Sequence, residues 1–175
     1  MKPNKKLFLG VVEQVSAACR PEGFVEHPAY DPGWEPANQA YEASLIRLVN
    51  AEFIDQLEIC FYPSLRSFSF DVTRIVNSFG FTSVDDIPQD AGLWTESWLY
   101  QPFDRYSLLS GQKWNPFSHF LQFRIGKRQP IDVDVEAAKI SQRFVRNSKY
   151  LYGALSGTYK GQMVHVAHHE IERPQ

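Results

Sequence analysis

Apolar residues near the start of the chain recur at the spacing of an α-helix. They occupy positions 7, 8, 11, 12, 15 and 18, and steps of three and four residues bring these positions onto one helical face. The pattern predicts an amphipathic helix that begins near Asn4, whose side chain would cap the first turn. The helix is predicted to end at Pro21-Glu22-Gly23.

The period changes to two in the middle of the chain. Two stretches alternate apolar with polar residues, which predicts antiparallel strands with one buried face each. The Tyr62-Pro63-Ser64 sequence marks the turn between them, because proline cannot donate to a central ladder. Residues 44–50 also fit a helical face, but we favour a third strand there. The apolar positions of the two alternating strands are Leu57, Ile59 and Phe61, then Phe68, Phe70 and Val72.

Short elements are predicted in the second half of the chain. Residues 84–88 have the pattern of one helical turn that a proline stops. A strand follows in which Trp94 and Trp98 share one side, because side chains alternate along a strand. The strands predicted in this half cover 93–100, 117–125 and 163–167.

A second long helix is predicted near the C-terminus. It begins at about Asp134, where acidic residues suit the positive N-terminal end of a helix. Gly153 is its predicted end. The apolar stripe of this helix consists of Ala137, Ile140, Phe144 and Leu151.

The order of helix, antiparallel strands and helix predicts an α+β fold. We expect a single antiparallel sheet of about five to six strands, with both long helices packed on one face and the other face open. Residues 27–38 hold three prolines and a glycine, so we expect an irregular loop there. Residues 170–175 are expected to form a polar tail, and 1–175 a single globular domain.

Composition supports a soluble, cytoplasmic domain. Hydrophobic residues make up 43% and aromatic residues 14% of the chain, enough for one core. No run of about 18 apolar residues occurs, which predicts no membrane-spanning helix, and the N-terminus lacks a signal-peptide pattern. Cys19 and Cys60 form no C-x-x-C pair and no disulfide framework, which suits a reducing cytoplasm.

Charge is distributed unevenly along the chain. Residues 1–100 carry 7 Lys or Arg against 14 Asp or Glu, and residues 101–175 carry 11 against 6. The two halves can neutralise each other within one fold, or they can present acidic and basic surfaces to partners. We favour the first interpretation.

A histidine cluster near the C-terminus is the sharpest local feature. His165, His168 and His169 lie close to Glu170, and imidazole and carboxylate groups are ligands for transition metals. A strand would place His165 and His169 on one face. A solvated polar chain end is the simpler interpretation, because such sites need further ligands from a rigid scaffold.

A cationic stripe on the second helix is a candidate nucleic-acid surface. Lys139, Arg143 and Arg146 recur at helical spacing, with Lys149 near by. The sequence pI of about 6.2 lacks the basic footprint of nucleic-acid-binding domains. We therefore favour a solvated helix face and do not expect a nucleic-acid partner.

No recognised catalytic or cofactor motif occurs in the sequence. Phosphate-binding glycine motifs are absent, and the serine of Gly153-Ala-Leu-Ser156-Gly157 stands one position late for a nucleophile elbow. We expect no cofactor and a non-enzymatic role. The alternative is a ligand-binding protein or enzyme that uses a pocket on the open sheet face, with His119 and the histidine cluster as titratable groups.

Aromatic residues in loops and at strand ends are candidate protein-binding anchors, because Trp and Tyr are favoured at interfaces. An acidic half that exposes such residues would suit a basic protein partner. The candidates are Tyr30, Trp34, Trp94, Trp98 and Trp114.

The order of elements resembles small bacterial α+β domains of unknown function, including immunity proteins of polymorphic-toxin loci. The resemblance rests on a first helix that ends at Gly23-Phe24, the paired strands 53–61 and 68–75, the Trp94 and Trp98 pair, and the closing helix. It implies a cytosolic bacterial protein that binds and blocks one toxin without chemistry of its own.

Overall fold

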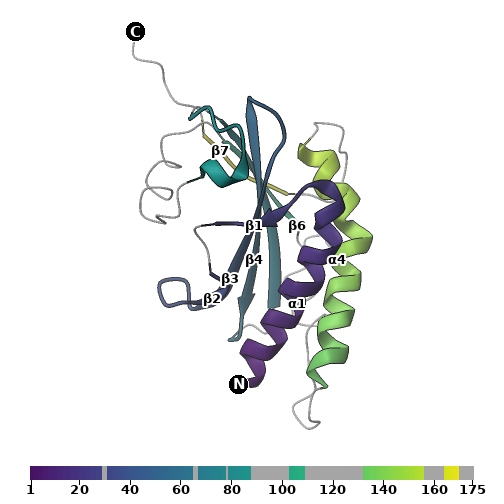
Figure 1. The fold of residues 1–175 in the computed structure, drawn as a ribbon. Helices are drawn as coiled ribbons and strands as arrows, with labels where there is room; N and C mark the ends of the chain where they lie inside the picture. The colour runs from purple at the N-terminus through teal and green to yellow at the C-terminus, as the bar shows by residue number, and fades with distance from the viewer. Residues whose placement is uncertain are drawn as a thin grey trace.

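Two long helices lie on one face of an antiparallel sheet in the computed structural model of this chain (Figure 1). The structure describes residues 1–28, 31–64, 67–77, 79–87, 103–108, 132–155 and 164–169. The predicted α+β fold, with an antiparallel sheet and both helices on the same side, is confirmed.

The first helix, α1, covers Pro3–Cys19. It begins earlier than predicted, because Lys2, two residues before Asn4, is its N-cap. Proline suits this first position, because the N–H that it lacks would have no helical partner there. A short 3-10 helix, η1, follows over Arg20–Glu22 and ends at Gly23, whose φ of 86° lies in the left-handed region that favours glycine. The predicted end of the helix is thus confirmed.

Within the described residues the sheet has seven strands, and every pairing between them is antiparallel. Their spatial order is β1-β3-β4-β5-β6-β7, and β2 also pairs with β3. Two of the seven are short edge strands, so the five longer strands match the predicted number. The strands are β1 Val25–Glu26, β2 Gly33–Glu35, β3 Ala40–Leu48, β4 Phe53–Tyr62, β5 Ser67–Val76, β6 Phe103–Leu108 and β7 Val164–His169.

Several predicted strands are confirmed and others differ. Of the residues 44–50, those from 44 to 48 belong to strand β3, as preferred over the helical alternative, and the strand predicted over 163–167 is β7. The expected loop of 27–38 contains strand β2, which pairs with β3 despite the neighbouring prolines. Strand β6 was not predicted. The strands predicted over 93–100 and 117–125 lie outside the described residues.

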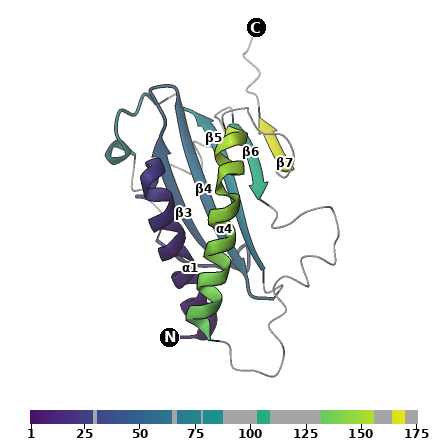
Figure 2. The ribbon, with the colours of Figure 1, turned by 90° about the vertical axis from the view of Figure 1, so that its right-hand side faces the viewer.

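The second long helix, α4, covers Val133–Leu155 and runs beside α1 in the same direction (Figure 2). Its N-terminal end is held by Asp132, whose carboxylate accepts hydrogen bonds from the N–H groups of Asp134 and Val135. The ammonium of Lys6 on α1 lies 2.9 Å from the Asp134 carboxylate. The helix continues past Gly153, so the predicted end there is wrong.

The main core fills the space between the sheet and the two helices. The helices approach closely where they cross, because a Cβ atom added at Gly10 would lie only 3.2 Å from the Cβ atom of Ala137. Buried residues at this interface alternate along the strands, as the two-residue period predicts. They include Phe8, Val11 and Val15 of α1, Leu57 and Ile59 of β4, Phe70 and Val72 of β5, and Ile140 and Phe144 of α4.

The opposite face of the sheet, which we expected to be open, is covered at one end. A short 3-10 helix, η2, covers Val84–Asp86 and confirms the predicted helical turn. Its segment packs Ile87 against Ile46 and Ile54 on this face. Neither of the long helices, as far as the structure describes them, is both long and apolar enough to cross a membrane.

Candidate protein-binding edge

An exposed tryptophan stands on the edge of the sheet where β2 pairs with β3. Trp34 is directly opposite Tyr41 in the register of the two strands. Its side chain remains 49% exposed, although its ring meets the Tyr41 ring edge-on, with centroids 5.1 Å apart and an interplanar angle of 69°. Such edge-to-face geometry is a favoured arrangement of aromatic pairs. Trp34 is therefore both accessible and held in place.

Tyr41 connects this tryptophan to the core through a row of aromatic rings. It stacks on Phe8 of α1 at 5.6 Å and on Phe61 of β4 at 6.3 Å. The row continues from Phe61 to Phe68 at 4.5 Å, from Phe68 to Phe70 at 6.4 Å, and from Phe70 to Phe144 of α4 at 4.9 Å. Movement of the Trp34 ring would thus disturb packing that extends across the sheet.

The turn between β2 and β3 is fixed by its own polar groups. The Gln39 backbone N–H donates to the Pro36 carbonyl at 3.3 Å, and Gln39 adopts a left-handed φ of 50°. The Ala37 N–H donates to the Glu35 carboxylate at 3.0 Å, and the Asn38 amide donates to Glu42 at 2.8 Å. These bonds fix the turn that joins β2, the strand that carries Trp34, to its partner β3.

Every charged side chain between Arg20 and Arg47, the stretch that forms this edge, is a carboxylate. Residues 21–46 contain five carboxylates and no Lys or Arg. The one histidine of the stretch, His27, is buried, and burial lowers its pKa to about 4, so that it is uncharged at neutral pH. We call this stretch, which includes β1, β2 and most of β3, the acidic edge. Its carboxylates belong to Glu22, Glu26, Asp31, Glu35 and Glu42.

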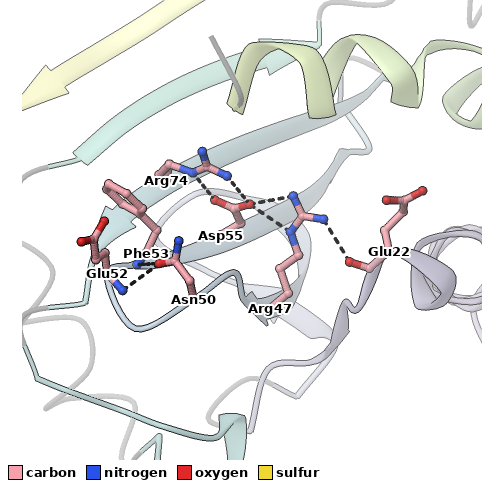
Figure 3. Close-up of polar contacts among 7 residues, drawn as sticks. All are labelled: Glu22, Arg47, Asn50, Glu52, Phe53, Asp55 and Arg74. Atoms are coloured by element: carbon pink, nitrogen blue, oxygen red, sulfur yellow. Dashed lines mark hydrogen bonds and ion pairs between the residues drawn. The ribbon is translucent and has the colours of Figure 1, made fainter. Parts of the chain in front are cut away.

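A buried ion cluster attaches the start of the acidic edge to the sheet (Figure 3). The Asp55 carboxylate, with a side chain that is 0% exposed, lies between Arg47 and Arg74 at shortest distances of 2.8 Å to each. Arg47 also donates to the Glu22 carbonyl at 3.0 Å, and its guanidinium lies 4.7 Å from the centre of the Phe24 ring. Arg47 of β3 thus holds the turn that follows α1, at the start of the acidic edge.

The sequence interpretation missed this cluster, although a signal for it was present. Side-chain alternation places Asp55 on the same side of its strand as Leu57 and Ile59. It places Arg74 on the same side of its strand as Val72. Charged residues on the apolar phase of adjacent strands indicate a buried ion pair, because an isolated buried charge is costly.

Trp34 is one of five aromatic residues predicted to bind a protein, and the structure confirms that it is exposed. The other four, Tyr30, Trp94, Trp98 and Trp114, lie outside the described residues, as does His119. Their role remains a prediction.

The predicted metal ligands lie on β7. His168 pairs in register with Asp104, and His169 pairs with Phe103. The register shifts before His165, which pairs with Tyr106, so the simple alternation that would place His165 and His169 on one face is interrupted. Side chains of β7 lie outside the described structure, and the part that is described contains no group of three or more potential metal ligands. Metal binding stays a prediction.

The described basic residues of α4 are exposed or half-buried. Lys139 is 67% exposed and its ammonium lies 3.5 Å from the Glu136 carboxylate. Arg146 is exposed and its Nε donates to the Gln142 carbonyl at 3.4 Å, whereas Arg143 is half-buried. The side chain of Lys149 is outside the described structure. These placements fit a solvated helix face, and nucleic-acid binding is untested.

Comparisons with models of protein families, with curated proteins and with solved structures found no match to this chain. The resemblance to immunity proteins therefore remains an expectation based on the order of elements. Function has to be inferred from the surface of the molecule itself.

Proposed function

We propose that this chain is a non-enzymatic protein-binding module that uses the acidic edge and Trp34 to hold a basic protein. The observation that carries the proposal is the half-exposed Trp34, fixed on an aromatic row. A rigid tryptophan loses little conformational freedom on binding, and tryptophans are enriched among residues that dominate interface energies.

Charge on the acidic edge supports a basic partner. Five carboxylates over residues 21–46, without a compensating Lys or Arg in the stretch, attract positive surfaces before contact is made. The expected role is of the immunity type, in which the module binds a toxin and blocks it. Association should then slow as salt is added, because salt screens exposed charges.

The test is binding to the protein encoded by the neighbouring reading frame, with both chains purified. Replacing Trp34 by Ala should weaken the complex by about thirty-fold or more, the effect of removing an interface hot spot of about 2 kcal/mol. Phe79→Ala is the matched control, because Phe79 is 45% exposed but lies outside the acidic edge. Its replacement should leave the affinity unchanged.

A toxicity assay tests the immunity role itself. The intact chain should protect cells that express the neighbouring product, and the Trp34→Ala variant should lose this protection at equal abundance. The proposal fails if the two proteins form no complex, or if Trp34→Ala and Phe79→Ala bind with the affinity of the unchanged chain.

A further inference from the structure

A surface cavity of about 580 Å³ lies beside the acidic edge, between the end of α1, strand β1 and helix η2. Buried Phe24 and Leu45 line it together with half-buried Val84, which supplies apolar wall. Polar groups also line it, and they belong to Ser16, Arg20, Glu26, Ser83 and Asp85. The volume is in the range of cavities that take small molecules or single side chains.

Three polar side chains of this cavity are not used by the fold, whereas the hydroxyl of Ser83, which also lines it, accepts from the Asp85 N–H at 3.2 Å. The Ser16 hydroxyl is buried and has no hydrogen-bond partner among the residues that the structure describes. Within the described residues, the carboxylates of Glu26 and Asp85 also have none. Asp86, by contrast, is used by the fold, because its Oδ2 accepts from the N–H groups of Thr82 and Ser83. A buried hydroxyl without a partner costs free energy, which a ligand that donates to it would recover.

The charges around the cavity favour a cation. Two exposed carboxylates face one exposed guanidinium, that of Arg20. The cavity also borders the C-terminal end of α1, where the carbonyl dipoles of a helix sum to a negative potential. Because Arg20 is exposed, its side chain can remain in water while the carboxylates bind an incoming positive group.

We propose that this cavity binds an arginine side chain of the basic partner, an inference that rests on the proposed function. The guanidinium donates to the Ser16 hydroxyl and to the carboxylates of Glu26 and Asp85. Its planar group carries five N–H donors, which suits three acceptors better than a compact ammonium does. The aliphatic stem lies on Phe24 and Val84.

The test uses N-acetyl-arginine methylamide as the probe and nitrogen-15-labelled protein observed by NMR. Backbone amides of residues 16–28 and 83–85 should shift saturably with added probe. N-acetyl-citrulline methylamide has nearly the same shape without the charge, and should shift them far less. Equal shifts with both probes, or stronger binding of the corresponding glutamate amide, would overturn the inference.

Variants of the lining residues locate the binding. Ser16→Ala and Glu26→Gln should each weaken probe binding about two- to five-fold, the range for exposed or half-exposed polar pairs. Glu13→Gln is the control, since Glu13 is an exposed carboxylate of α1 outside the cavity. Equal weakening by Glu26→Gln and Glu13→Gln, with no effect of Ser16→Ala, would mean that only net charge attracts the probe, which contradicts a defined site.

Trp34→Ala separates this inference from the proposed function. The variant should leave probe binding unchanged while it loses the protein partner. If the probe does not bind but the partner still depends on Trp34, the cavity inference alone is wrong. If the probe binds and no partner depends on Trp34, the proposed function fails and the cavity still binds arginine.

Discussion

Asp55 and Arg74 stand opposite each other on β4 and β5, and the fully buried carboxylate of Asp55 accepts two hydrogen bonds from the Arg74 guanidinium, at 2.8 Å and 3.0 Å. Arg47 of β3 donates to the same carboxylate from the other side, at 2.9 Å and 2.8 Å. Three neighbouring strands are thereby joined by side chains as well as by their backbones. Removing the central carboxylate leaves two positive groups facing each other.

We predict that Asp55→Asn destabilises the fold by about 3–5 kcal/mol, the cost of breaking a buried charge pair. The measurement is urea unfolding followed by circular dichroism. Asp134→Asn is the matched control, because it breaks the exposed ion pair to Lys6 and should cost less than about 1 kcal/mol. Similar losses in the two variants would contradict the assigned importance of the buried cluster.

The close approach of α1 and α4 predicts that Gly10→Val is destabilising. The added Cβ atom would lie 3.2 Å from that of Ala137, which is tighter than most such contacts, and overpacking of this kind costs about 1–3 kcal/mol. Ala137→Gly in the same chain should recover part of the loss, because it removes the opposing atom. Thermal unfolding of both single variants and the double variant measures the coupling, and strictly additive effects would rule out the contact.

Burial of His27 predicts a pH dependence of stability. Its pKa is lowered from 6.5 to about 4 in the folded protein, so that between these values the unfolded chain binds a proton that the folded chain does not. Protonation therefore favours unfolding, and stability falls as the pH drops from about 6.5 towards 4, by at most about 1.4 kcal/mol per pH unit.

The contribution of His27 can be isolated by comparison with His27→Gln. The stability difference between the two proteins should shrink as the pH falls from 7 to 5, because the variant has no imidazole to protonate. Urea unfolding at several pH values in this range provides the measurement. Parallel pH profiles for the two proteins would refute the assignment.

Both cysteines are predicted to be unreactive in the folded protein. Cys19 and Cys60 are buried, and burial together with nearby Glu58, Glu42 and Asp71 raises the pKa of the Cys60 thiol to about 12. Because the thiolate is the reactive form, Ellman's reagent should label neither thiol at pH 8 and should label both in urea. Rapid labelling of one thiol without denaturant would show that its site opens.

Local periodicity was sufficient to predict the central sheet. Alternation at Leu57, Ile59 and Phe61 reflects the one property that every half-buried strand shares, a single apolar side. Periodicity alone could not explain Asp55, a charged residue on the apolar side of its strand. The role of this carboxylate depends on Arg47 and Arg74 of the neighbouring strands. The register that brings these residues to Asp55 depends on contacts between strands.

The errors at the acidic edge and at the end of α4 have physical causes too. Prolines around Trp34 favour irregular structure locally. Strand β2 nevertheless forms because it pairs with β3, and this pairing cannot be predicted from the neighbouring residues in the sequence. Gly153 was expected to end its helix, whereas Gly10 lies inside α1 without ending it. A glycine costs about 1 kcal/mol in a helix, which is too little to decide a boundary.

The direct succession of β3, β4 and β5 bears on how the protein folds. These strands occupy residues 40–76 and are joined by short turns, one of which is held by Asn50, whose side chain accepts from the N–H groups of Glu52 and Phe53. Joining α1 to α4, in contrast, closes a loop of more than a hundred residues. Because short loops close at lower entropic cost, we expect the three-stranded meander to form first and the helix pair last, so that φ-values should be high at Leu57 and low at Ala137.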